Sequence, residues 1–260
     1  MKRLFVILLL LTSCAVLKYV PSEVEWQLDM SSKPTVDKYF FTQNKTFYNN
    51  NSVLFMDSMV TVTDSGLVIR CIRQPGKATT WQKTDSFQFV SGMIQSWNKD
   101  TAWHTKLVEK GGTWIVTARI PRSWSALWLL HPDYSVAGYD TRKFIIPEVD
   151  FAENNGNRID NCVHYGYSDS VYNTHSLVRL MHRPDGRLHE YAVKILPGGY
   201  DFYLDGIRKT RYRGRGRDGF TAYSQPYYLV INNASDTRFN ADSTALLVKR
   251  VAYISAGRKK

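Results

Sequence analysis

Short segments rich in β-branched and aromatic residues, each ended by a turn signal, recur along most of this chain and constrain its fold more than any other feature. They lie at residues 52–62, 67–72, 190–196, 200–204 and 244–254, and the turns Asp64-Ser65-Gly66 and Pro197-Gly198-Gly199 separate neighbouring members. No long segment has the apolar periodicity of a helix. We therefore expect an all-β protein, either a sandwich or a barrel.

The chain has no internal repeat and no change of composition that marks a second domain. After removal of an N-terminal export signal, about 245 residues remain, a length that suits one large β domain. We expect this single domain to span residues 25–260 and to be a monomer.

The first residues have the pattern of an export signal, because two basic residues precede the apolar run 4–11. That run is too short to span a bilayer. It ends in Leu11-Thr12-Ser13-Cys14, which resembles a bacterial lipobox that is cut before its cysteine. We predict a signal peptide at residues 1–13 and a lipidated Cys14 with a linker over 14–24, hence an exported lipoprotein anchored in the outer membrane or at the cell surface. An ordinary signal peptide with an incidental cysteine is the alternative.

Three acidic residues, Glu148, Asp150 and Glu153, alternate with apolar residues in the middle of the chain. On a strand, alternate side chains share a face, so Glu148 and Asp150 point the same way. Glu153 falls on the opposite face of a regular strand, but a β-bulge between Asp150 and Glu153 returns it to the first face. The segment therefore predicts a bulged strand with three carboxyl groups on one side.

Such a row of carboxyl groups suits cleavage of a glycosidic bond, in which one carboxyl group donates a proton and a second acts as nucleophile or base. Retaining enzymes hold the two groups roughly 5–5.5 Å apart, and we expect two glutamates that lean across a shared aspartate to reach that separation. The aspartate also separates their pKa values, because like charges resist simultaneous ionisation. A solvated strand face that is acidic without a chemical role is the alternative.

The flanking segments agree with this motif in order and spacing. Residues 124–130 (Trp-Ser-Ala-Leu-Trp-Leu-Leu) precede it, residues 163–166 (Val-His-Tyr-Gly) follow it, and residues 225–234 (Gln-Pro-Tyr-Tyr-Leu-Val-Ile-Asn-Asn-Ala) lie near the C-terminus. Together with Glu-x-Asp-x-x-Glu at 148–153, they resemble glycoside hydrolase family sixteen, which includes laminarinases, lichenases, agarases and carrageenases. The resemblance extends over residues 86–255, and the bulged motif is the form found in laminarinases, agarases and carrageenases.

The resemblance implies a two-sheet antiparallel jelly-roll sandwich of the concanavalin A-like lectin and glucanase type, with the acidic strand on its concave face. It implies an endo-acting, retaining glycoside hydrolase that cleaves a β-linked polysaccharide, either a glucan or a galactan. In that scheme Glu148 is the nucleophile, Glu153 is the acid and base, and Asp150 tunes both.

The same resemblance assigns substrate-binding roles. It implies that Trp124 stacks on a sugar ring and that His164 and Asn232 form hydrogen bonds near the cleavage point. Trp128 shares the face of Trp124 on a strand, where it either lines the cleft or packs in the core. His164 has the alternative of a histidine satisfied inside the sandwich. Ser125 replaces the proline usual in the family, and such departures leave the sugar and the linkage open.

Metal ligands are not evident in the sequence. His175, His182 and His189 lack the spacing of zinc ligands, so we predict no catalytic metal and no cofactor. A structural calcium ion occurs in some members of the family, and no ligand set for it can be read here. Cys71 and Cys162 either form a disulfide or stay free and buried.

The chain carries a net charge of +11, and a dense part of it lies in the Arg/Gly run at residues 208–217. A solvated loop is the simplest interpretation of this run. A rim that attracts an anionic glycan such as a sulfated galactan is the sharper one, because guanidinium groups pair with oxyanions bidentately. RNA binding is typical of such a run in the cytosol, but it does not suit an exported chain, and we predict no nucleic-acid partner.

Three functions remain open on this scaffold. Hydrolysis of a polysaccharide is the leading one. A transglycosylase uses the same residues and differs only in how water is excluded. A non-catalytic glycan-binding lipoprotein is the third, and the presence of both Glu148 and Glu153 argues against it.

Overall fold

The structure is a computed structural model, and it describes residues 24–48, 52–80, 83–97, 107–130, 148–165, 175–213, 226–235 and 242–256. The predicted signal peptide, Cys14 and the linker as far as residue 23 lie outside the described residues. Over the ranges that are described, no helix combines the length and the apolar character needed to cross a membrane.

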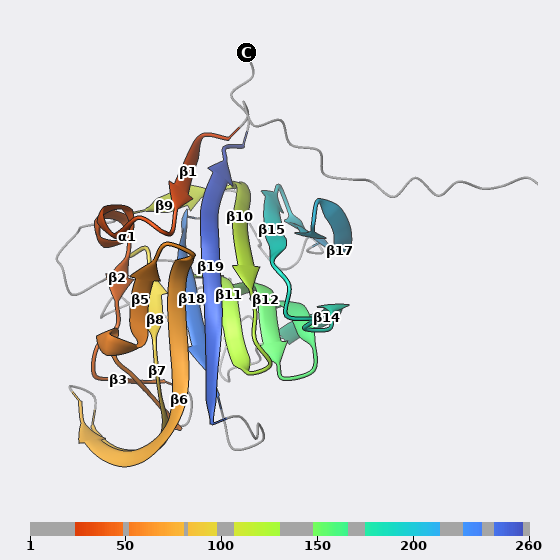
Figure 1. Cartoon of the computed structure of the whole chain (residues 1–260). Helices are drawn as coiled ribbons and strands as arrows, with labels where there is room; N and C mark the ends of the chain where they lie inside the picture. The colour runs from red at the N-terminus through yellow and green to blue at the C-terminus, as the bar shows by residue number, and fades with distance from the viewer. Residues whose placement is uncertain are drawn as a thin grey trace, which may run out of the picture.

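The described strands form two β-sheets (Figure 1). The larger, with eleven strands, contains β1 (Trp26–Asp29), β3 (Thr46–Tyr48), β4 (Val53–Phe55), β5 (Val60–Thr63), β6 (Gly66–Thr79), β7 (Thr84–Ser91), β10 (Gly112–Arg119), β15 (His189–Leu196), β16 (Gly199–Leu204), β17 (Ile207–Arg213) and β19 (Ser243–Ile254). The smaller, with eight, contains β2 (Phe41–Thr42), β8 (Met93–Gln95), β9 (Val108–Lys110), β11 (Trp124–Leu130), β12 (Glu148–Asn155), β13 (Ile159–Tyr165), β14 (His175–His182) and β18 (Pro226–Ala234).

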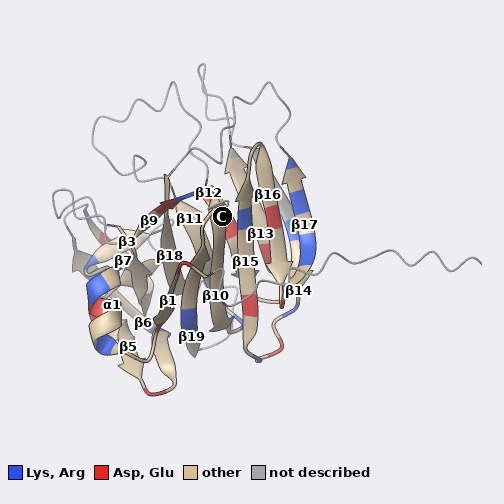
Figure 2. Cartoon of the chain, turned by 90° about the horizontal axis from the view of Figure 1, so that it is seen from above, with Lys and Arg blue, Asp and Glu red and all other residues tan. Residues whose placement is uncertain are grey.

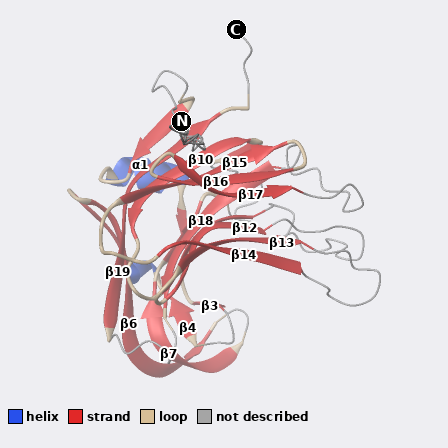
Figure 3. Ribbon diagram, turned by 90° about the vertical axis from the view of Figure 1, so that its right-hand side faces the viewer, coloured by secondary structure: helices blue, strands red, loops and turns tan. Residues whose placement is uncertain are grey.

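The strand order is that of a sandwich. In the larger sheet it is β17-β16-β15-β10-β19-β6-β7-β4-β3, with β1 beside β19 and β5 beside β6, and in the smaller sheet it is β14-β13-β12-β11-β18-β8-β2, with β9 beside β18. Among the described strands, β4 and β7 form the one parallel pair. Figure 3 shows β15, β16 and β17 in one layer and β12, β13 and β14 in the other. The prediction of an all-β, two-sheet antiparallel jelly roll is confirmed.

A large hydrophobic cluster fills the space between the two sheets. Phe202 of the larger sheet and Leu127 and Phe151 of the smaller sheet are among its buried members. Complete burial of a side chain of this kind stabilises the folded state by about 1.5–3 kcal/mol. This shared core fixes the smaller sheet, and with it β12, against the rest of the protein.

A second cluster lies on the other face of β11 and β18. The strands β6 and β7 curve strongly (Figure 3), which brings β4 and β7 over that face. Phe55 and Phe89 pack there with Trp128 and Val230. One part of the outer face of the smaller sheet is thereby covered, whereas β12 and β13 keep partly exposed side chains on it.

The structure tests the predicted strands individually. The hairpin around Gly198 is confirmed, since β15 ends at Leu196, β16 begins at Gly199, and Gly198 has a φ of 73° that suits glycine. The single strand predicted over residues 52–62 is wrong. The chain forms β4, the 3-10 helix η2 (Asp57–Met59) and β5 there. Because β4 pairs in parallel with β7 and β5 pairs antiparallel with β6, the chain has to turn between them.

One short helix, α1 (Lys33–Tyr39), precedes β2. Ser32 caps it, with its side-chain oxygen accepting from the backbone N–H of Thr35, and a proline lies in its first turn. Val36 is its buried residue and joins the main core. The helix covers the core without contributing to the acidic strand.

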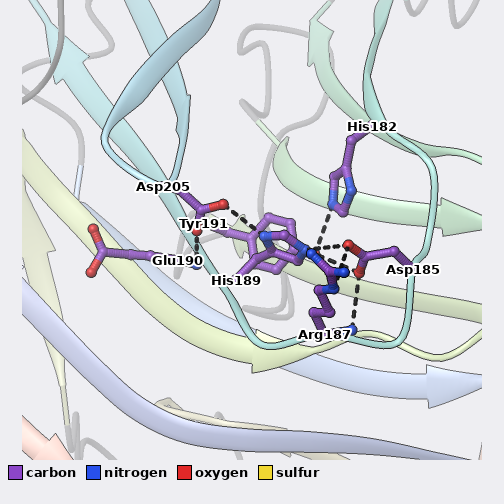
Figure 4. A network of polar contacts seen from close by, with 7 residues as sticks. All are labelled: His182, Asp185, Arg187, His189, Glu190, Tyr191 and Asp205. Carbon is purple, nitrogen blue, oxygen red and sulfur yellow. Dashed lines mark hydrogen bonds and ion pairs between the residues drawn. The ribbon is translucent and has the colours of Figure 1, made fainter.

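A histidine network joins the two sheets where the chain passes from β14 to β15 (Figure 4). The ring nitrogens of His189 lie 2.7 Å from Asp205 Oδ2 and 3.0 Å from Asp185 Oδ1. His182 Nε2 lies 2.9 Å from the hydroxyl of Tyr191. Because β14 belongs to the smaller sheet and β15 to the larger one, these contacts fix the edge of the smaller sheet beside β13.

Candidate active site

The predicted bulge is present in β12. Residues 151 and 152 face a single residue of β13, and the pairing with β11 shifts at the same place. Both of these residues, Phe151 and Ala152, are fully buried in the core between the sheets. Glu148, Asp150 and Glu153 consequently lie on the opposite side of the strand, which we call the acidic face. The prediction of a bulge between Asp150 and Glu153 is confirmed.

His164 joins this row from β13, where it pairs with Glu148 across the strands. Its Nε2 lies 3.0 Å from Asp150 Oδ2 and 3.9 Å from Glu148 Oε1. The side chain of Asp150 is 5% exposed, whereas those of Glu148 and His164 are 30% and 33% exposed. The imidazole therefore bridges a buried carboxyl group and one that solvent reaches.

Trp124 holds the third carboxyl group. It is the first residue of β11, and its indole Nε1–H donates a hydrogen bond to Glu153 Oε1 at 2.9 Å. Both side chains are half-buried. The bond orients the carboxyl group of Glu153, a role additional to the sugar stacking that the sequence predicts for Trp124.

Trp128 and Asn232 form a buried pair beside the row. The Nε1–H of Trp128 donates to Asn232 Oδ1 at 2.9 Å, from β11 to the adjacent β18. The Trp128 ring is buried in the second cluster. Of the two interpretations that the sequence left open for Trp128, the structure favours the core, and the ring acts by orienting the amide of Asn232.

Burial raises the pKa of all three carboxyl groups on the acidic face. For Glu148, loss of solvent is the largest cause and the charge of Asp150 adds to it, while His164 opposes the change; the resulting pKa is about 7. For Glu153, burial and then Asp150 raise the pKa, and the hydrogen bond from Trp124 lowers it. The two glutamates thus differ in the groups that tune them.

The Asp150 carboxyl group also controls His164. Its hydrogen bond is the main cause that raises the pKa of His164, to about 11, and a contact with Cys162 adds to the effect. At neutral pH the His164–Asp150 pair therefore holds a proton across its 3.0 Å bond. This places a positive charge beside Glu148.

Two residues of the acidic face were not identified from the sequence. Asp160 and Cys162 lie on β13 at positions that alternate with His164, so all three share a face. The alternation of these residues with His164 could have indicated that they share its face. That they also lie beside the carboxyl groups of β12 depends on the register between β12 and β13, which the sequence does not give. Asp160 is buried and bonded to Arg158 at 3.1 Å, and its charge contributes to the raised pKa of Glu153.

Cys162 lies among potential metal ligands. Its sulfur, a carboxylate oxygen of Asp150 and a ring nitrogen of His164 all lie within 4.8 Å of one another. Cys71 and Cys162 are both free and buried. The sequence left open whether these two cysteines form a disulfide or remain free, and in the structure they are free thiols.

The arginines of the basic run that the structure describes lie on the other sheet. Arg208, Arg211 and Arg213 belong to β17, which carries blue bands beside β16 in Figure 2. All three contact the carboxylate of Asp201 on β16, at 3.6, 2.9 and 3.1 Å. Residues 214–217 lie outside the described residues. The described arginines are thus part of a salt-bridge cluster on the larger sheet, away from the face that carries Glu148.

No family model matches the chain, and no curated protein matches its sequence. Solved structures do match. The laminarinase catalytic domain from Thermotoga maritima is 14% identical with a TM-score of 0.68, and the match covers 90% of this chain and 98% of that domain.

Two further structures widen the range of enzymes with this architecture. An endo-acting O-glycanase of the human gut microbiota has a TM-score of 0.69 at 14% identity, covering 90% of this chain and 91% of its own. Porphyranase B from Zobellia galactanivorans has a TM-score of 0.62 at 14% identity, covering 84% and 86%. At these identities the likeness is one of fold, and the chain has the laminarinase fold that its resemblance to glycoside hydrolase family sixteen implies.

Proposed function

We propose that this protein is an endo-acting, retaining glycoside hydrolase that cleaves a β-linked polysaccharide. The bulge of β12 supports this most strongly, because it brings Glu148, Asp150 and Glu153 to one face, with His164 and Trp124 bonded to them. Such a row costs folding free energy through desolvation and repulsion. Groups perturbed in this way cluster at functional sites.

The proposed reaction has two steps. In the first, the carboxylate of Glu148 attacks the anomeric carbon, the carboxyl group of Glu153 gives its proton to the glycosidic oxygen, and the bond between that oxygen and the anomeric carbon breaks. In the second, the carboxylate of Glu153 takes a proton from water, and the water oxygen displaces Glu148 from the sugar. Glu153 ends protonated and Glu148 ends ionised, ready for another cycle.

The neighbouring residues assist each step. The proton held by His164 and Asp150 places positive charge 3.9 Å from Glu148 and favours its ionised form. The indole of Trp124 fixes the carboxyl group that moves the proton. Trp128 orients Asn232, which lies across β11 from Glu153, and we propose that the amide of Asn232 contacts the sugar.

A β-linked glucan or galactan is the proposed substrate. The laminarinase fold favours a glucan. The likeness to a porphyranase favours the alternative of a sulfated galactan. Activity on the two substrates should depend differently on salt. Salt screens the attraction between exposed charges of the protein and a sulfated chain, so activity on a sulfated galactan should fall as salt is added. Activity on a neutral glucan should not change in this way.

Reducing-end release by the purified protein, beside Glu148→Gln, tests the proposal. The panel contains laminarin, mixed-linkage glucan, agarose, carrageenan and mucin, the last because of the O-glycanase likeness. We expect release from one polymer by the parent protein and none by the variant, with internal cleavage that shortens chains rapidly. Products longer than the substrate indicate a transglycosylase. Binding to a polymer without release by either protein indicates a glycan-binding module and contradicts the proposal.

We also propose that the protein is exported and anchored in a membrane through a lipidated Cys14. The lipobox-like Leu11-Thr12-Ser13-Cys14 supports this, and more than one acyl chain is needed for stable anchoring. Fractionation of cells tests it. Cys14→Ala is expected to move the protein from the membrane fraction to the soluble fraction, and unchanged membrane retention contradicts the anchor.

A further inference from the structure

We propose that Asp150, Cys162 and His164 form a binding site for Zn²⁺ and that Zn²⁺ bound there blocks the active site. The binding part depends on the placement of these three side chains and on no catalytic activity. The inhibition part rests on the proposed function, because it requires Asp150 and His164 to serve the reaction.

The geometry brings three different donor atoms together. A carboxylate oxygen, a thiol sulfur and an imidazole nitrogen lie within 4.8 Å of one another, two of them on β13 and one on β12. Tetrahedral Zn²⁺, with bonds of about 2.0–2.3 Å, separates its ligand atoms by about 3.3–3.8 Å. Side-chain movements of roughly 1 Å would therefore bring the three ligand atoms from their present separations to those of a tetrahedral Zn²⁺ site.

The donor set selects the metal. Thiolate and imidazole ligands suit Zn²⁺ and Cu⁺ and do not suit Ca²⁺ or Mg²⁺, which prefer sites made entirely of oxygen. Two strands joined by hydrogen bonds carry the three ligands, so the site is on rigid elements. Zn²⁺ is accordingly the probe of choice, and Ca²⁺ and Mg²⁺ are the matched controls.

An entry path and a fourth ligand are both present. Asp150 and Cys162 are buried, whereas His164 is 33% exposed, so the metal enters from the His164 side. Glu148 Oε1 lies 3.9 Å from His164 Nε2 on that side and completes a tetrahedron, or a water molecule does. In either case the metal lies beside the proposed nucleophile.

Calorimetric titration of the purified protein with zinc chloride tests the site without any assay of activity. We expect about one Zn²⁺ per chain, binding that Cys162→Ser weakens by roughly 10–100-fold or more, and no displacement of the bound Zn²⁺ by Ca²⁺ or Mg²⁺. Cys71→Ser is the matched control, since Cys71 is also free and buried but has no ligand partner in the described set. It is expected to bind Zn²⁺ as the parent does.

A second measurement identifies the thiolate ligand in the parent protein itself, whether or not the variant folds. Co²⁺ in place of Zn²⁺ gives a thiolate-to-metal charge-transfer band in the near ultraviolet, which we expect in the parent and in Cys71→Ser and not in Cys162→Ser. Absence of Zn²⁺ binding in the parent, or equal binding by the parent and a folded Cys162→Ser, overturns the site. If Zn²⁺ binds as expected while no polymer is cleaved, the site stands and the proposed function fails.

Discussion

Replacement of His164 by glutamine removes a positive charge from the acidic face and keeps a hydrogen-bond donor for Asp150. In the native protein the charge lies 3.9 Å from Glu148 Oε1. At an effective dielectric constant of about 20, that separation corresponds to about 4 kcal/mol of attraction. Both side chains are about one third exposed, so screening by solvent reduces this to about 2 kcal/mol.

The sign of the effect follows from the nucleophilic role that we propose for Glu148. A carboxyl group acts as a nucleophile only when ionised, and the pKa of Glu148, about 7, results from burial and Asp150 acting against His164. Without the positive charge, the pKa of Glu148 rises further, and less of the protein is active on the acidic side. We expect kcat/KM to fall by roughly 30-fold there, and the acidic limb of its pH profile to move to higher pH.

The assay is initial-rate hydrolysis of the preferred polymer over a pH series, with His182→Gln as the matched control. His182 lies on the neighbouring β14, pairs with Ile159, and contacts Tyr191 and not the acidic face. Its replacement is expected to leave the acidic limb in place. An equal loss at every pH in His164→Gln, with no movement of the limb, refutes the electrostatic role given to His164.

Three further substitutions test other contacts. Trp124→Phe keeps a ring and removes the donor to Glu153, so the pKa of Glu153 rises and the basic limb of the kcat/KM profile moves to higher pH; a change of KM alone contradicts this. Asp201→Asn breaks the arginine cluster of β16 and β17 and should lower the free energy of unfolding in urea by about 1–3 kcal/mol. Burial raises the pKa of Asp201, but the arginines outweigh this effect and the pKa is lowered overall. The difference in stability is therefore present at neutral pH and disappears as pH falls through the folded-state pKa. A difference that persists in acid contradicts the role given to the arginine cluster. Burial lowers the pKa of His189, but the bonds of His189 to Asp205 and Asp185 outweigh this effect, so the pKa is raised overall. The stability lost in His189→Gln should therefore be largest below about pH 6.5 and vanish as pH rises through the folded-state pKa, and equal melting temperatures at acidic pH contradict the network.

Much of the fold and the acid row could be predicted because they depend on local alternation. Acidic and apolar residues alternate along the segment, and this alternation is broken once between Asp150 and Glu153. The residue types therefore predict both the strand and the bulge, and the structure has the bulge there. The burial of Trp128 could not be predicted, because it depends on the curvature of β6 and β7, which are distant in sequence. The position of Cys162 beside Asp150 depends on strand register for the same reason. Residues 52–62 form two strands and not one because β4 pairs in parallel with β7, and no local sequence pattern indicates that pairing.

In the proposed reaction, Glu148 forms a covalent bond to the sugar and Glu153 moves the proton. Mass spectrometry of the protein after brief reaction with an activated 2-fluoro glycoside of the preferred sugar shows whether that bond forms and on which residue. We predict a mass increase of one glycosyl unit on the peptide that contains Glu148, and no increase in Glu148→Gln. An active protein that gives no adduct, or an adduct on a different residue, contradicts the assignment of Glu148 as the nucleophile.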